Sequence, residues 1–271
     1  MGAYSMITDA APRVPRVVVV GLASCFGCQL QITNAEQYLT QILGQIDLRY
    51  WQLVTSEDMP DEFDVAIIEG AVTTKESEET CKLVRSKAAH VMAIGACAVT
   101  GGVPGMAIDR LQTGVDLVYD GTAPDACGEM VLPRPVSAVI PVDSEVRCCP
   151  IDPYDFVRHL HRALFGSNRV EQSRTMCADC KRNETECFFE QGTLCLGLVT
   201  RAGCGARCVN LGRPCNGCAG LSPAANLDAA HESCERYGVP VADFDKALQM
   251  FNQVALANVS LGSDPNDTSR G

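Results

Sequence analysis

Long hydrophobic runs and basic residues are both scarce in this sequence. The longest uninterrupted apolar stretches, such as VVVVGLA at residues 17–23, fall far short of the roughly 20 residues that span a bilayer. Lys and Arg number 22 against 33 Asp and Glu in 271 residues, a net charge of −11, and no run of Lys or Arg exceeds two residues. Because its apolar runs are short, we expect no membrane span. Because it has no basic patch to neutralise a phosphate backbone, we expect no nucleic-acid partner.

An export signal is also missing, whereas cysteine is abundant. The N-terminal sequence MGAYSMITDAAPRVPR contains neither an apolar signal core nor paired arginines, so we expect a cytoplasmic protein whose thiols stay reduced. Sixteen cysteines are a high load for such a protein, and disulfides do not explain them in a reducing compartment. Metal binding is therefore the leading interpretation.

The first part of the chain alternates β-branched runs with helical stretches. Expected strands lie at 16–24, 47–54, 64–70, 90–96 and 137–143, and expected helices lie at 29–44, 76–89, 153–165, 227–238 and 244–259. This alternation predicts an α/β fold, a flavodoxin-like open parallel sheet. Eight of the sixteen cysteines crowd between residues 177 and 218, which indicates a domain boundary. We predict a flavodoxin-like domain at 1–168 and a loop-rich iron–sulfur cap domain with C-terminal helices at 169–271.

Several cysteines directly follow the expected strands. In open α/β sheets, ligands bind outside the carboxyl ends of the strands, so residues at those ends meet at one edge. Strand ends carry, in chain order, Cys25 and Cys28, Glu69, Cys97, and Cys148 and Cys149. The sequence therefore predicts that Cys25, Cys28, Cys97 and one of the adjacent pair close around one cofactor.

The cysteine-rich segment has the spacing of two four-ligand sites. It reads C-x2-C-x6-C-x7-C-x8-C-x3-C-x6-C-x2-C from Cys177 to Cys218. Little apolar periodicity accompanies it, so we expect its stability to come mostly from metal centres. The spacing alone also allows two zinc ions. The whole set of twelve cysteines, four at a sheet edge and eight in a cap, favours three iron–sulfur clusters in a row.

Two other interpretations compete for the C-x-x-C pair at Cys25 and Cys28. A thioredoxin-type redox dithiol leaves Cys97 and Cys149 unexplained. A Cys₄ zinc site has the right number of ligands, but structural zinc usually occupies short knuckles and not three strand ends of one sheet. A zinc-stapled interaction module without catalysis is the alternative from another functional class.

The combination of motifs resembles the small, electron-transferring subunit of [NiFe] hydrogenases, and within it the cytoplasmic sulfhydrogenase δ type that works with NAD(P) or F420 partners. The resemblance extends from Val17 to Gly220. It rests on SCFGCQLQ, DVAIIEG, IGACAVTGG, CCP and the segment CLGLVTRAGCGARC followed by PCNGC.

This resemblance implies three [4Fe-4S] clusters with assigned ligands. The proximal ligands are Cys25, Cys28, Cys97 and Cys149; the medial ligands are Cys204, Cys208, Cys215 and Cys218; the distal ligands are Cys177, Cys180, Cys187 and Cys195. Periplasmic relatives carry His at the position resembling Cys177 and Pro at the position resembling Cys208, with a medial [3Fe-4S] cluster. Both positions are Cys here, which implies four irons in each cluster.

The sequence departs from the family pattern beside the last proximal ligand. The family usually has Gly there, whereas this chain has Cys148; Cys149 is the preferred ligand because it precedes Pro150, as in the family. Glu69 resembles a family glutamate near the proximal cluster. Proton handling is one expectation for it, and an N-cap or a buried hydrogen bond to backbone is the other. The remaining cysteines are Cys81, expected to be a small core residue, and Cys127 and Cys234, to which no role is assigned.

The resemblance implies an electron-relay subunit of a hydrogenase. The Ni–Fe site would belong to a large-subunit partner, and a flavin- and iron–sulfur-containing diaphorase partner would reduce NAD(P). F420 or another acceptor is the alternative. The homologous quinone-reductase subunit of respiratory complexes shares the first domain, but it usually has adjacent cysteines in its first motif and lacks the eight-cysteine cap.

Overall fold

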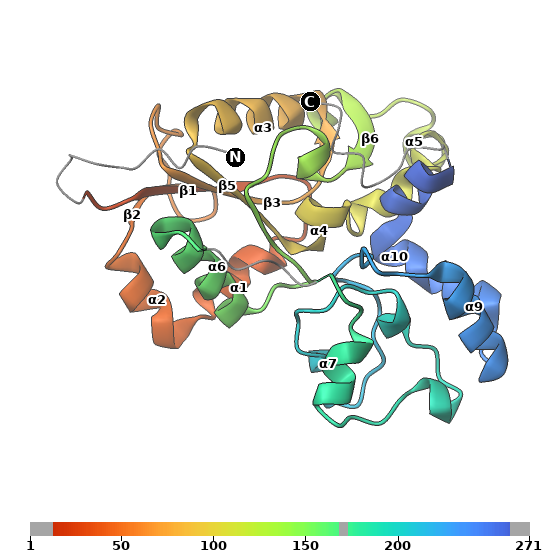
Figure 1. Ribbon diagram of the computed structural model, residues 1–271. Helices are drawn as coiled ribbons and strands as arrows, with labels where there is room; N and C mark the ends of the chain where they lie inside the picture. Colours follow the sequence, from red (N-terminus) through yellow and green to blue (C-terminus); the bar gives the residue numbers. More distant parts are fainter. Residues whose placement is uncertain (1–12, 168–172, 261–271) are drawn as a thin grey trace, which may run out of the picture.

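A five-stranded parallel sheet organises the first part of the molecule (Figure 1). The computed structural model describes residues 13–167 and 173–260. The sheet has the order β2-β1-β3-β5-β7, and every neighbouring pair is parallel. Its strands are β1 (Arg16–Gly21), β2 (Asp47–Trp51), β3 (Val65–Glu69), β5 (His90–Ile94) and β7 (Ser144–Val146). Counted along the chain, this is the flavodoxin-like order, so the predicted fold class is confirmed.

The two central strands are buried on both faces because their sequences are almost continuously apolar. β1 reads RVVVVG and β3 reads VAIIE, and Gly21 pairs with Glu69 where both strands end. Helices cover the two faces: α3 (Lys75–Lys87) lies on one, and α1 (Gly27–Thr33), α2 (Glu36–Leu43) and α6 (Pro153–Phe165) lie on the other (Figure 1). One apolar core lies on each side of the sheet.

Local structure differs from expectation in three places. The helix expected at 29–44 is two helices, α1 and α2, which part at Asn34 and Ala35. The strand expected at 137–143 is wrong: the chain forms a 3-10 turn at Val136–Ala138 and reaches the sheet only at β7. Pro135 and Pro141 flank that stretch, and proline lacks the N–H that a sheet ladder needs. A two-stranded antiparallel sheet of β4 (Val72–Thr74) and β6 (Met130–Arg134) was not expected.

The remaining elements of the first part connect the sheet to its surroundings. They are α4 (Gly95–Thr100) and α5 (Leu111–Tyr119), with 3-10 turns at Pro104–Ala107 and Asp125–Cys127. The side chain of Cys127 lies outside the part of the chain that the structure describes.

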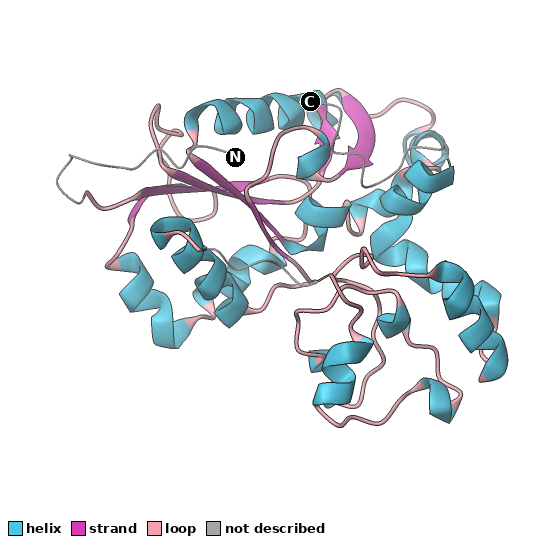
Figure 2. Cartoon of the chain, in the orientation of Figure 1, coloured by secondary structure: helices cyan, strands magenta, loops and turns pink. Residues whose placement is uncertain are grey.

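The cysteine-rich segment is mostly loop (Figure 2). It contains α7 (Cys177–Arg182), α8 (Arg207–Asn210) and 3-10 turns at Phe189–Gln191 and Leu196–Leu198. Two helices follow it, α9 (Leu227–Arg236) and α10 (Val241–Ser260), which confirms the terminal helices expected from the sequence. Within the described residues, no helix combines the length and apolar character that crossing a membrane requires.

A third apolar core lies under the cysteine-rich segment, and the sequence pattern did not reveal it. Leu196 and Val199 of the segment pack with Phe244 and Leu248 of α10. The far end of α10 reaches the sheet layer, where Val254 packs so closely on Gly101 that a Cβ there would lie 2.6 Å from its methyl group. An apolar core therefore contributes to the order of this segment, and α10 ties it to the sheet.

Candidate functional site

Four cysteines from three strand ends come together at the carboxyl edge of the sheet. Cys25 and Cys28 follow β1, Cys97 lies in α4 directly after β5, and Cys149 follows β7. The thiol of Cys149 lies in electrostatic range of Cys97 and Cys25, and that of Cys28 in range of Cys149 and Cys97. The edge lies beside the point between β1 and β3 where the strand order reverses, which is where open α/β sheets bind ligands.

Glu69 fixes the position of Cys28 at this edge. Its side chain is only 1% exposed, and its Oε1 accepts a hydrogen bond of 3.0 Å from the backbone N–H of Cys28. Its Oε2 has no hydrogen-bond partner among the described residues. The expected buried hydrogen bond to backbone is thus confirmed.

Burial shapes the acidity of these thiols. It raises the pKa of Cys28 and of Cys97, and it raises the pKa of Cys149 to about 11. The neighbouring thiols add to each shift, because one thiolate disfavours another. Gly95 is required here: it has φ +82, and a Cβ at that position would overlap the Sγ of Cys28. Such thiols keep their protons until a cationic centre displaces them.

A second group consists of the first four cysteines of the cysteine-rich segment. Cys177 and Cys180 lie in α7, and Cys187 and Cys195 lie in the loops that follow. The thiol of Cys177 is in electrostatic range of the other three. Burial raises its pKa to about 11. The structure therefore brings this predicted set together.

The third group consists of Cys204, Cys208, Cys215 and Cys218. The Sγ of Cys204 accepts hydrogen bonds from the backbone N–H groups where α8 begins. Cys208 is in electrostatic range of Cys204 and Cys218, and Cys215 is in range of Cys218. The thiol of Cys215 also lies 3.6 Å from the hydroxyl of Thr200.

Contacts join the three groups in a fixed order. The thiol of Cys149, from the sheet-edge group, lies in electrostatic range of the thiol of Cys218 in the third group. The backbone N–H of Cys215, also in the third group, donates to the Sγ of Cys195 in the second at 3.3 Å. The third group therefore lies between the other two.

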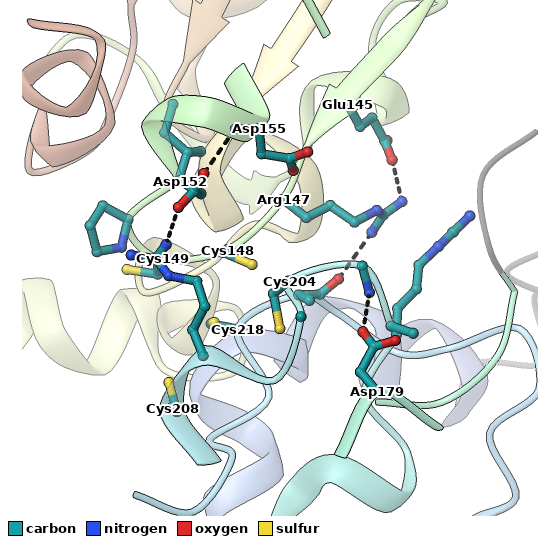
Figure 3. A pocket seen from close by; sticks show the side chains of 18 of the residues that line it. Glu145, Arg147, Cys148, Cys149, Asp152, Asp155, Asp179, Cys204, Cys208 and Cys218 are labelled. Carbon is teal, nitrogen blue, oxygen red and sulfur yellow. Dashed lines mark hydrogen bonds and ion pairs between the residues drawn. The ribbon is translucent and has the colours of Figure 1, made fainter. Parts of the chain in front are cut away.

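Cys148 and Cys149 point to different groups (Figure 3). Whereas Cys149 lies with the sheet-edge thiols, the thiol of Cys148 lies in electrostatic range of Cys204 and Cys218. These contacts raise the pKa of Cys148 and lower that of Cys218, and they lower the pKa of Cys204 to about 6. Sequence reasoning left Cys148 without a place, since no spacing rule predicts which way the first of two adjacent cysteines points.

A cavity of about 610 Å³ opens between the sheet edge and the cysteine-rich segment (Figure 3). An ion pair of 2.9 Å between Arg207 and Asp152 joins α8 to the start of α6 beside it. Another tie is the hydrogen bond of 3.2 Å from Arg147 to the carbonyl of Ala219. The cysteines that line the cavity are Cys148, Cys149, Cys204, Cys208 and Cys218.

The donor chemistry of all three groups fits iron–sulfur clusters. Each group offers four thiols, the ligand type and number that [4Fe-4S] clusters take. Within the described residues, no three Cys, His, Asp or Glu side chains converge tightly enough to hold a single metal ion. A four-iron cluster is a larger body and needs its thiolates spread around it.

Two of the remaining cysteines lie away from these groups. Cys81 is fully buried in the core between α3 and the sheet, which confirms the expectation of a small core residue. Cys234 is equally buried in the core under the cysteine-rich segment. Burial raises the pKa of both thiols. Neither has the surroundings of a reactive thiol.

Comparison with known proteins finds relatives along most of the chain. Residues 25–163 match the family described as NADH ubiquinone oxidoreductase, 20 kDa subunit. Sulfhydrogenase 2 subunit delta of Pyrococcus furiosus is 30% identical over 234 residues, which cover 86% of this chain and 97% of that protein. A subunit of the F420-non-reducing hydrogenase vhu of Methanocaldococcus jannaschii is 27% identical over 272 residues, 90% of this chain and 93% of that protein.

A solved structure shares the fold. A chain of the NAD+-reducing [NiFe]-hydrogenase in its H2-reduced state superposes with a TM-score of 0.54 at 22% identity, over 59% of this chain and 96% of that one. The family match ends before the eight-cysteine segment, whereas both relatives extend through it.

Proposed function

This chain belongs to the family of the 20 kDa subunit of NADH ubiquinone oxidoreductase and is a small-type hydrogenase subunit, and from that premise we propose that it relays electrons through three [4Fe-4S] clusters. Iron–sulfur clusters held by its cysteines would supply one-electron transfer. The observation that carries the proposal is the ordered series of three four-thiol groups.

We assign the ligands of each cluster from this series. Cys25, Cys28, Cys97 and Cys149 hold the proximal cluster; Cys204, Cys208, Cys215 and Cys218 hold the medial one; Cys177, Cys180, Cys187 and Cys195 hold the distal one. The proximity of Cys149 to Cys218 and the hydrogen bond from Cys215 to Cys195 support the order proximal, medial, distal. The protein's part is to fix the spacing of the thiols and to surround them with apolar side chains and amide donors, which set reduction potentials.

The same assignment supports the domain division. The cores on the two faces of the sheet are built from residues of β1 to α6, and the third core is built from the cysteine-rich segment and the last two helices. We propose a boundary at residues 168 and 169, with the proximal ligands before it and the medial and distal ligands after it.

An electron relay needs a partner subunit at each end of its series of clusters. We propose a large subunit carrying the Ni–Fe site at the proximal end, where H2 is oxidised or protons are reduced. At the distal end we propose flavin- and iron–sulfur-containing diaphorase subunits that use NAD(P). The acceptor proposal rests on the motif resemblance, since the NAD+-reducing complex supports the fold alone. F420 stays the alternative acceptor, because the relatives include both a subunit named F420-non-reducing and one named coenzyme F420 hydrogenase.

Metal analysis tests the proposal directly. The protein, purified anaerobically with whatever copurifies, should hold about twelve iron and twelve acid-labile sulfide per chain, as three four-iron clusters require. H2-dependent reduction of NAD+, NADP+ and F420 by the same sample then identifies the acceptor. Two or three zinc ions with no sulfide would overturn the relay and favour the zinc-stapled module.

A further inference from the structure

The turn that follows Cys218 lies directly against the sheet edge. Gly220 in this turn is buried, and its φ of +82 lies in the left-handed region that favours glycine. A Cβ at this position would lie 2.8 Å from the Cγ2 methyl of Thr100, which ends α4, and 3.3 Å from the Nη1 of Arg147, which follows β7. Ordinary contact begins at 3.4 Å, so the turn and the sheet edge leave no room for a side chain at Gly220.

Hydrogen bonds hold the two side chains that face Gly220. The hydroxyl of Thr100 donates at 2.9 Å to a backbone carbonyl one turn earlier in α4, which fixes the rotamer that presents its methyl group to the glycine. The Nη1 of Arg147 donates at 3.2 Å to the carbonyl of Ala219, and its guanidinium is ion-paired with Glu145 (Figure 3). Neither side chain can therefore move aside without losing a hydrogen bond.

This contact lies within three residues of proposed ligands on both of its sides. Thr100 follows Cys97 by three residues and Arg147 precedes Cys149 by two, and both cysteines are assigned to the proximal cluster. On the other side, the glycine lies two residues after Cys218, which is assigned to the medial cluster. A change in how closely the turn approaches the sheet edge would therefore move the two clusters relative to each other.

We propose that the contact of Gly220 with Thr100 and Arg147 fixes the separation of the proximal and medial clusters. This inference rests on the proposed function. It makes the three residues positioning residues, none of which is a ligand. Because electron transfer between two centres slows steeply as the gap between them widens, the missing side chain at Gly220 keeps this step of the relay fast.

Three substitutions separate the close contact from backbone strain. Gly220→Ala places a Cβ between the turn and the sheet edge and should force them apart. Thr100→Ser removes the methyl group that the new Cβ would meet and keeps the hydroxyl, so the double variant should let them close again. Gly238→Ala is the matched control, because Gly238 has a φ of +71 and nothing within 4 Å of its Cβ position. It carries similar backbone strain without the close contact.

The spin–spin splitting between reduced clusters measures their separation, because the dipolar interaction falls with the inverse cube of the distance. Each variant is purified anaerobically with whatever copurifies, fully reduced and measured by electron paramagnetic resonance. We expect a smaller splitting in Gly220→Ala and the wild-type splitting in Gly220→Ala/Thr100→Ser. Thr100→Ser alone and Gly238→Ala should also keep the wild-type splitting. Iron and sulfide content should match that of the wild type.

Arg147→Met tests the same contact without a change of backbone. It removes the hydrogen bond to the Ala219 carbonyl, so the turn is held less firmly against the sheet edge. We expect the splitting to broaden and its mean to fall. This variant decides the question if Gly220→Ala loses its iron.

Two results would overturn the inference. A wild-type splitting in Arg147→Met, and in Gly220→Ala where that variant keeps its iron, would show that the contact does not set the separation. A smaller splitting that Gly238→Ala shares, or that Thr100→Ser does not restore, would make backbone strain the cause. A wild-type complex without iron and sulfide would defeat the proposed function itself, which is a different failure.

Discussion

Glu69 is a buried carboxylate with two oxygens in unlike surroundings. Oε1 holds the Cys28 amide, and Oε2 lacks a partner among the described residues. We expect Glu69→Gln to keep the iron content, because the amide oxygen still accepts the Cys28 N–H. Iron and acid-labile sulfide analysis of the purified variant measures this.

A second variant controls for the hydrogen bond of Glu69. Glu69→Ala leaves the buried amide of Cys28 unsatisfied and should cost about 1–3 kcal/mol of stability. Loss of about four irons from Glu69→Gln would contradict the expectation that an amide oxygen replaces this acceptor.

The choice between Cys148 and Cys149 is a second question at this scale. We expect Cys149→Ser to lose about four of roughly twelve irons, because a hydroxyl is a poor ligand for iron where a soft thiolate is needed. Cys148→Ser is the matched control and should keep all of them. Iron and acid-labile sulfide analysis of both purified variants tests this assignment. Loss of iron from Cys148→Ser but not from Cys149→Ser would make Cys148 the ligand.

Which cysteines gather at the sheet edge was predictable, because a strand end fixes the position of the residue that follows it. Cys25, Cys28 and Cys97 needed only that rule. The direction of Cys148 was not predictable, since it depends on a positive φ at a single residue and on thiols some 60 positions away in the sequence.

At the scale of elements, a buried side chain of α7 connects this helix to the loop before α8. Asp179 of α7 is 5% exposed, and it accepts a hydrogen bond of 3.0 Å from the N–H of Gly203 and an ion pair of 2.9 Å from Arg182. Gly203 adjoins Cys204, so this carboxylate connects the second cysteine group to the third.

We expect Asp179→Ala to weaken that connection. Loss of the Gly203 hydrogen bond should cost about 1–3 kcal/mol, whereas the ion pair adds little because Arg182 is 60% exposed. The thermal unfolding midpoint should fall, and iron should leave the medial and distal sites faster under chelation. Asp228→Ala, at an exposed position of α9, is the control. Equal behaviour of the two variants would show that Asp179 does not hold the groups together.

The long apolar runs of β1, β3 and β5 made those strands predictable, whereas the fifth strand was misplaced. That strand, Ser144–Val146, has only three residues and includes the charged Glu145. It joins the sheet by pairing with the outer edge of β5. The more apolar stretch at 137–143 is interrupted by Pro141. Tertiary pairing thus overrode local propensity at the sheet edge.

At the scale of the whole molecule, apolar cores hold the parts in place. Apolar cores cover both faces of the sheet, and a third core packs α9 and α10 under the cysteine-rich segment. The spacing of the cysteines in the sequence predicted metal ligands, but the third core draws on helices beyond the segment, which no periodicity within 177–218 revealed.

The difference between the apolar cores and the loops that carry the proposed iron ligands predicts how the molecule responds when iron is removed. Thiols that lose their metal centre stop anchoring the loops that carry them, while the apolar cores remain. After anaerobic treatment with a strong iron chelator, limited proteolysis should therefore cut first within 183–194 and 203–217. Fragments containing β1 to α6 should persist, because every central strand there is buried on both faces. The iron-loaded protein, digested in parallel, should resist at both loops. First cuts within the sheet would mean that the clusters, and not the cores, hold the first part of the chain together.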